Sequence, residues 1–344
     1  MLRKHGPDLA RDAARSLVPA WPRAVRETKS RRLLARAMKL AAALGDADLA
    51  ARLLGPFRLT DLDTGCVAPL AQLCAACGGE RVQALLARQD EDARHDRDEG
   101  DGSWETRLAV LCDAIRDEGS PAMRAIASWL PAHEWEVARP IGVRVLADVD
   151  RPRAAEELRA IGIWLVHIAD AAVAADAPVL RDAIVRFLTS PQHDFPVDAL
   201  LGTLRTARER IAPPRLARLG LAPLAAHVAE TLQAAVSEPG RSPDDWSIRA
   251  PMRCTCELCA TLRGFLSSPR QRQLEWPLAQ DRRLHVQHQI DVYALPVDHV
   301  TRRKGRPYTL VLSKRKELFA REQRMRRQWR QDLAWIGRQR RHFG

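Results

Sequence analysis

Three cysteines in the last third of the sequence are the residues best placed to do chemistry. Cys254, Cys256 and Cys259 have the spacing C-x-C-x-x-C, so their thiols can meet around one ion where a turn leads into a helix. A tetrahedral zinc site needs four ligands, which are usually thiolates and imidazoles. The sequence therefore predicts a zinc site whose fourth ligand is a histidine.

Three histidines follow within 40 residues and could supply that ligand: His285, His288 and His299. We favour His285, with His288 second, because residues three apart share one face of the helix expected over 279–290. No glutamate stands in an H-x-E arrangement that could use an open zinc position, so we predict a structural site. An iron–sulfur cluster would need a fourth thiolate, and the remaining cysteines all lie at or before Cys112.

Positive charge is concentrated in the segment that follows these ligands. The 344-residue chain has a net charge of +12, and residues 301–344 hold 15 Lys and Arg against three Asp and Glu. Residues 1–300 therefore carry equal numbers of each sign. This distribution predicts a neutral body with one cationic appendage.

The pattern of residues around and within this cationic segment predicts a β-hairpin followed by a helix. The strands are expected at 298–301 and 308–313 and the helix over 314–336. Arginine pairs well with phosphates and carboxylates, so we expect an acidic protein surface or a nucleic acid as partner. Alternatively, the arginines solvate a helix whose Trp, Leu and Phe face docks on the protein itself. The candidate polyanion-binding residues are Arg302, Arg303, Lys304, Arg306, Lys314, Arg326, Arg327 and Arg330.

The first 236 residues show helical periodicity and contain no strand candidate. A hairpin pattern around Gly45 returns 33 residues later around Gly78, and a looser third copy starts near residue 111, beyond an acidic insertion at 90–102. We expect a mainly α fold: a solenoid-like repeat body over 1–236, a linker over 237–250, and a small α+β zinc module over 251–344. The insertion is predicted to be a surface loop.

Several classes of protein are disfavoured by the sequence. No stretch of 18 apolar residues is present and the N-terminus is charged, so neither a membrane span nor a signal peptide is expected. Seven cysteines, three of them clustered, fit reduced thiols and metal, and we predict a cytoplasmic protein from a GC-rich bacterial genome. Motifs for nucleotide binding, serine hydrolysis and zinc proteolysis are missing, so no enzyme activity is predicted.

One resemblance extends over about 65 residues. It is carried by Cys254-x-Cys256-x-x-Cys259, Leu262-x-x-Phe265-Leu266 with Pro269, Arg283-x-His285, and Thr301-x-x-x-Gly305-x-Pro307-x-Thr309-Leu310-Val311-x-x-Lys314. This order is similar to the C-terminal Cys/His-rich region of proteins resembling 2-oxoglutarate/iron(II) dioxygenases of the prolyl-hydroxylase type. The resemblance implies His285 as the fourth ligand and a dioxygenase domain or protein as partner. Because the sequence has no His-x-Asp pair, it implies the non-catalytic half of such a system.

Together these features predict a non-catalytic interaction or scaffold protein with a structural zinc ion and an arginine-rich tail. The alternatives are an accessory half of a dioxygenase system and a nucleic-acid-binding protein.

Overall fold

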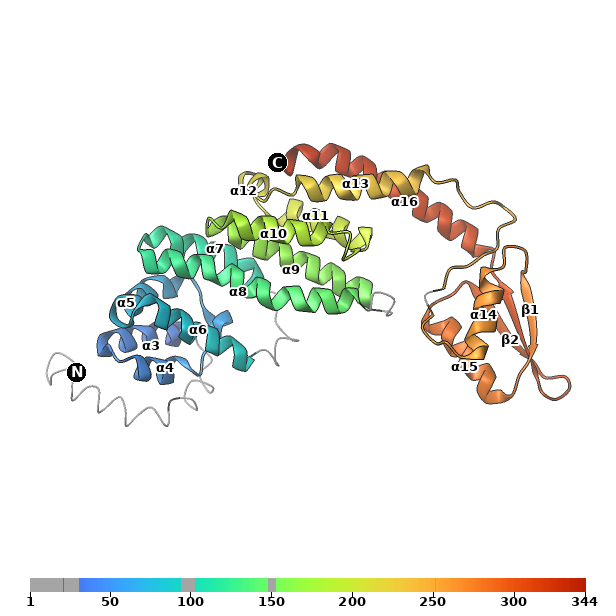
Figure 1. Ribbon diagram of the computed structural model, residues 1–344, viewed down its shortest axis with the longest axis horizontal. Coiled ribbons are helices and arrows are strands. Elements are labelled where there is room, and N and C mark those ends of the chain that lie inside the picture. The colour runs from blue at the N-terminus through green and yellow to red at the C-terminus, as the bar shows by residue number, and fades with distance from the viewer. Residues whose placement is uncertain (1–20, 22–30, 94–102, 148–152, 251) are drawn as a thin grey trace.

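A computed structural model describes residues 21, 31–93, 103–147, 153–250 and 252–344 of this chain. The described part is mainly helical, with a small antiparallel sheet near the C-terminus, which confirms the predicted fold class (Figure 1). The body contains α3 (Arg31–Leu44), α4 (Ala47–Leu54), α5 (Val67–Cys77), α6 (Gly79–Ala93), α7 (Ser103–Glu118), α8 (Pro121–Leu146), α9 (Ala154–Ala174), α10 (Pro178–Thr189), α11 (Val197–Arg210), α12 (Pro213–Arg218) and α13 (Ala222–Ser237). The C-terminal part contains α14 (Glu257–Ser267), β1 (Gln273–Pro277), α15 (Gln280–Val292), β2 (Val297–Arg302), β3 (Thr309–Lys314) and α16 (Glu317–Gln339).

The two glycines that the sequence pattern aligns have the same local role. Gly45 ends α3 with φ +62° and Gly78 ends α5 with φ +88°, a conformation that favours glycine. After the first glycine, the Asp46 side chain accepts hydrogen bonds from the N–H groups of Asp48 and Leu49 and so starts α4. Helical hairpins therefore form where they were expected, and their equivalence as true repeats stays a prediction.

The acidic insertion differs from its prediction in the part that the structure describes. Helix α6 continues through Ala93, so the first residues of the expected loop are helical. The remainder, 94–102, lies outside the described residues, as does the charged N-terminus on which the absence of a signal peptide was predicted. No helix among the described residues is both long enough and apolar enough to cross a bilayer.

Buried apolar side chains form two clusters in the helical body and one in the C-terminal part. Helix α8 belongs to both body clusters, because Leu130 lies in the first and Trp135 in the second. Helix α9 does the same, because Ala171 lies in the first cluster and Leu165 in the second, so two long helices join the halves of the body. The third cluster is centred on Leu262, Phe265 and Leu310, which bring α14 and the sheet together. We call the unit formed by α14, α15 and the three strands the module.

The module contains one strand more than the sequence predicted. The expected pair β2 and β3 is confirmed as an antiparallel hairpin, with Val300 opposite Val311. Strand β1 pairs with the other side of β3, with Trp276 opposite Leu310, so the strand order is β1-β3-β2. Pro277 is tolerated at the end of β1 because this strand is at the edge of the sheet.

Helix α16 begins at the module and returns to the helical body, where it lies beside α13 (Figure 1). Its residue Ile336 and the nearby Phe343 are buried in the same cluster as the side chains of α9, α11 and α13. Asp332 is buried as well, and its Oδ1 accepts hydrogen bonds from Arg205 Nη2 at 2.6 Å and Gln328 Nε2 at 2.8 Å. The apolar face of this helix therefore docks on the protein itself.

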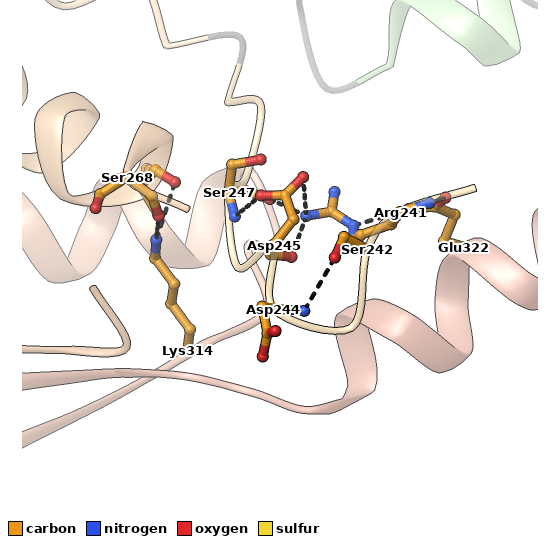
Figure 2. A network of polar contacts seen from close by, with 9 residues as sticks. Arg241, Ser242, Asp244, Asp245, Ser247, Ser268, Lys314 and Glu322 are labelled. Atoms are coloured by element: carbon orange, nitrogen blue, oxygen red, sulfur yellow. Dashed lines mark hydrogen bonds and ion pairs between the residues drawn. The ribbon is translucent and has the colours of Figure 1, made fainter. Parts of the chain in front are cut away.

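The segment between α13 and α14 is tied to α16 through side chains (Figure 2) and to α14 through a backbone hydrogen bond from the N–H of Ile248 to the carbonyl oxygen of Leu266. Arg241 donates from its backbone N and its Nε to the two carboxylate oxygens of Glu322 on α16, at 2.9 and 2.8 Å. Its Nη1 also donates to the carbonyl oxygens of Asp245 and Ser247. Trp246 is buried and packs edge-to-face on Phe319 of α16, with ring centroids 5.1 Å apart. The predicted linker is thus an ordered connection.

Candidate metal centre and cationic surface

Three cysteines and one histidine meet at the start of α14. The ligand atoms of Cys254, Cys256, Cys259 and His285 all lie within 4.8 Å of one another. The Nε2 atom of His285 is 3.7, 3.4 and 3.2 Å from the sulfurs of Cys254, Cys256 and Cys259. These four residues could hold a metal ion, and they are the set that the sequence favoured.

Local structure explains why the three thiols converge. Cys254 and Cys256 precede α14, with Cys256 as its N-cap in extended backbone, whereas Cys259 lies in the first turn and is buried. Arg263, one turn further along, donates from Nη2 to the carbonyl oxygen of Cys254 at 2.9 Å and from Nε to that of Cys259 at 3.2 Å. This arginine fixes the loop on the helix. Its role was not predicted from the sequence, although its position four residues after Cys259 is a signal for such a contact.

The histidine reaches the cysteines because α15 is anchored on the sheet side. Arg283 is buried and donates to the carbonyl oxygens of Leu278 and Tyr308, while its guanidinium lies 5.4 Å from the centre of the Tyr308 ring. The two alternative ligands are not part of the cluster. His288 is exposed, and the Nε2 of His299 on β2 contacts the Oδ1 of Asp291 at 3.0 Å.

The thiols of the cluster differ in acidity. The pKa of Cys256 is lowered to about 6, first by the hydrogen bond from the backbone N–H of Cys259 and then by the thiol of Cys254. Burial raises the pKa of Cys259 to about 12. A metal ion bound here would therefore have to displace a proton from Cys259, which makes its affinity dependent on pH.

The remaining cysteines are packing residues. Cys74 and Cys77 form a C-x-x-C sequence inside α5, and both are buried in the first apolar cluster, as expected for core residues. Burial raises the pKa of Cys74 to about 11 and that of Cys66 to about 11. These thiols stay protonated near neutral pH and are poor metal ligands.

Three of the eight predicted polyanion-binding residues make contacts within the protein: Arg302, Arg326 and Lys314. Arg302 donates two hydrogen bonds of 2.9 Å to the carboxylate of Glu275 on β1. Arg326 donates from Nη2 to the carbonyl oxygens of Val236 and Glu238 at the end of α13. Both contacts hold the cationic segment on the rest of the chain.

Lys314 is the residue for which the prediction of partner binding is wrong. It is only 6% exposed, and its Nζ donates to the carbonyl oxygens of Leu266 at 3.0 Å and Ser268 at 2.7 Å (Figure 2). It shares the inward face of β3 with Leu310 and Leu312, because alternate residues of a strand point the same way.

The other five predicted cations are exposed. Arg303, Lys304 and Arg306 form the tip of the β2–β3 hairpin, and Arg327 and Arg330 lie on the outer face of α16. None of the five has an acidic partner within the described part of the chain. Arg327 and Arg330 also line a cavity of 360 Å³ together with Gln323 and Gly240. The one carboxylate on its wall, Glu322, is already bound to Arg241.

No family model, curated protein or solved structure matches this chain. The resemblance to the region associated with dioxygenases, and with it the expected dioxygenase partner, stays a prediction.

Proposed function

We propose that this chain is a non-catalytic interaction protein in which a structural zinc ion stabilises the module and the exposed arginines bind an acidic protein partner. The observation that carries the proposal is the closed set of four ligands, Cys254, Cys256, Cys259 and His285. A zinc ion held by four protein side chains has no open position for a substrate, which is typical of structural sites.

The distances within the cluster support zinc. Typical Zn–S and Zn–N bond lengths place a sulfur and a nitrogen about 3.5 Å apart at two corners of a tetrahedron. The three sulfur distances from His285 Nε2, 3.2 to 3.7 Å, bracket this value. Thiolate-rich sets with one imidazole also suit Zn²⁺ better than Mg²⁺ or Ca²⁺, which prefer oxygen ligands.

The outer face of α16 supports an acidic partner. Its exposed charged side chains are Arg321, Arg324, Arg327, Arg330 and Arg338 together with one acidic residue, Glu317, whose Oε1 lies 4.0 Å from Arg324 Nη2. The other two acidic residues, Glu322 and Asp332, point toward the protein and are paired with arginines. A guanidinium can donate two parallel hydrogen bonds to one carboxylate. The helix is about 35 Å long at 1.5 Å per residue, so this face can contact an extended acidic surface.

Binding of a fluorescein-labelled polyglutamate to the zinc-loaded protein tests this function. We expect binding at low salt that weakens at least tenfold in an Arg327→Gln/Arg330→Gln variant. Arg36→Gln/Arg124→Gln is the matched control, since both arginines are exposed on the helical body, and it should bind like the wild type.

A labelled DNA duplex of the same charge is the competing probe. If the duplex binds much more tightly, with an affinity that falls steeply with salt, the partner is a nucleic acid and the proposed protein partner is wrong. If neither probe binds, or if the control variant loses as much affinity as the α16 variant, the α16 surface has no such role.

A further inference from the structure

A groove of 580 Å³ lies between the C-terminal half of α8 and α10, away from the residues used above. One wall is a stripe of Pro140, Val143 and Ala147, which are three and four residues apart and therefore share one face of α8. All three are exposed, and Val143 is 43% exposed. Ala183 on α10 forms part of the opposite wall. The body thus presents an apolar strip to solvent.

The floor of this groove is aromatic and tightly packed. The rings of Trp135 and Phe187 meet edge-to-face, with centroids 5.3 Å apart. Phe187 also contacts His193 and Phe195, at 4.5 and 5.5 Å between ring centroids. A Cβ atom at Gly142 would lie 3.3 Å from Phe187, so this ring rests directly on the backbone of α8. A floor held on so many sides is preformed for a ligand.

Only cationic side chains bear formal charge on the lining of the groove. Arg139, Arg144 and Arg186 lie on it, and no aspartate or glutamate does. Arg139 is already paired with Glu136 at 3.0 Å and lies 5.9 Å from the Trp135 ring. Arg144 and Arg186 are exposed, and neither has an acidic partner among the residues that the structure describes.

We propose that this groove binds an acidic peptide segment of a partner protein, which inserts a bulky apolar side chain between carboxylates. The apolar strip selects the inserted side chain, and Arg144 and Arg186 select the flanking carboxylates. A basic segment is repelled, and a purely acidic one leaves the strip uncovered. The strip from Pro140 to Ala147 is about 10 Å long at 1.5 Å per residue, which suits two turns of an amphipathic helix.

The proposal goes beyond the function proposed for α16, because the groove and the outer face of α16 share no residue. A fluorescein-labelled 14-residue peptide with leucine and phenylalanine at helical spacing among aspartates and glutamates is a suitable probe. Two matched peptides complete the set: one has serine in place of the apolar residues, and the other has lysine in place of the acidic residues. Each is titrated into the zinc-loaded full chain.

We expect the acidic-apolar peptide to bind at least tenfold more tightly than either matched peptide. An Arg144→Glu/Arg186→Glu variant should lose at least tenfold of that affinity, and Val143→Ser, which is conservative for folding, should lose several-fold. Arg124 is exposed on the same helix outside the groove, so Arg124→Glu is the control and should bind the acidic-apolar peptide as tightly as the wild type does. Circular dichroism establishes that each variant is folded.

Three outcomes would overturn the proposal. Equal binding of the serine peptide would mean that charge alone is recognised, and equal binding of the lysine peptide would mean that apolar contact alone is recognised. Loss of binding in Arg327→Gln/Arg330→Gln, with none in the groove variants, would place the peptide on α16. That last result would leave the function proposed for α16 intact, so the two proposals fail separately.

Discussion

His285 and His288 lie one helical turn apart on α15, and only His285 reaches the thiols. We predict that His285→Ala lowers the zinc content from about one ion per chain to a small fraction, because removal of one of four ligands opens the site. His288→Ala is the matched control and should keep its zinc. Elemental analysis of the purified variants measures both. Equal zinc content in the two variants would contradict the assignment.

Lys314 is buried, and this burial lowers the pKa of its side chain from the ordinary value of 10.5 to about 8. Between these two values the unfolded chain holds more protons than the folded one, so the contribution of this residue to stability rises with pH. We expect the free energy of unfolding of the wild type, relative to Lys314→Met, to increase by about 1 to 2 kcal/mol between about pH 7.5 and about pH 9.5.

Urea unfolding at the two pH values gives this difference directly. The comparison with Lys314→Met cancels the titration of the thiols, which both proteins share. A difference that stays constant, or that shrinks as pH rises, would show that the ammonium keeps its charge in the folded protein.

The sequence was sufficient to predict the cysteines, but it could not separate the histidines. Three thiols within six residues must lie together whatever the fold, whereas the choice of His285 over His288 and His299 depends on how α15 rotates against α14. The inward direction of Lys314 was predictable, since it has the same parity as Leu310 and Leu312 along β3. Its positive charge favoured an exposed position and obscured this signal.

At the scale of elements, α16 is held on the body by a short apolar face. Ile336 is 1% exposed within the second body cluster, so Ile336→Ala should lower the free energy of unfolding by about 2 to 4 kcal/mol. Met325 on the same helix is 43% exposed, and Met325→Ala should lower the free energy of unfolding by less than about 0.5 kcal/mol. Thermal or urea unfolding measures both. Similar losses in the two variants would mean that α16 does not dock as described.

Helix positions were predictable in the body, and pairings at longer range were not. Gly45, Gly78 and Asp46 mark helix ends by local chemistry alone. Strand β1 was missed because its five residues contain only Leu274 and Trp276 as an alternating apolar signal, followed by Pro277. Helix α16 docks against α13 and Arg205, which lie about 100 residues or more before the α16 residues that they contact. Helical periodicity gives no information about partners so far apart in the sequence.

At the scale of the whole molecule, the module and the body have separate apolar clusters. Removal of zinc by a chelator should therefore unfold the module while most of the body stays folded, since metal binding and folding are coupled in small metal sites. Hydrogen exchange should become fast in α14 and in the three strands and stay slow in α5 to α13. Exchange in the module that is unchanged by chelation would contradict a structural role of the metal.

Because α16 returns to lie beside α13, the module is topologically an insertion between two neighbouring helices of the body. The inserted segment begins after Ser237 at the end of α13 and ends at α16, and both of these helices are held by contacts with the body. The entropy cost of closing such a loop rises by only about 0.6 kcal/mol for each doubling of its length. A body in which a short flexible connection replaces the module should therefore keep its own fold.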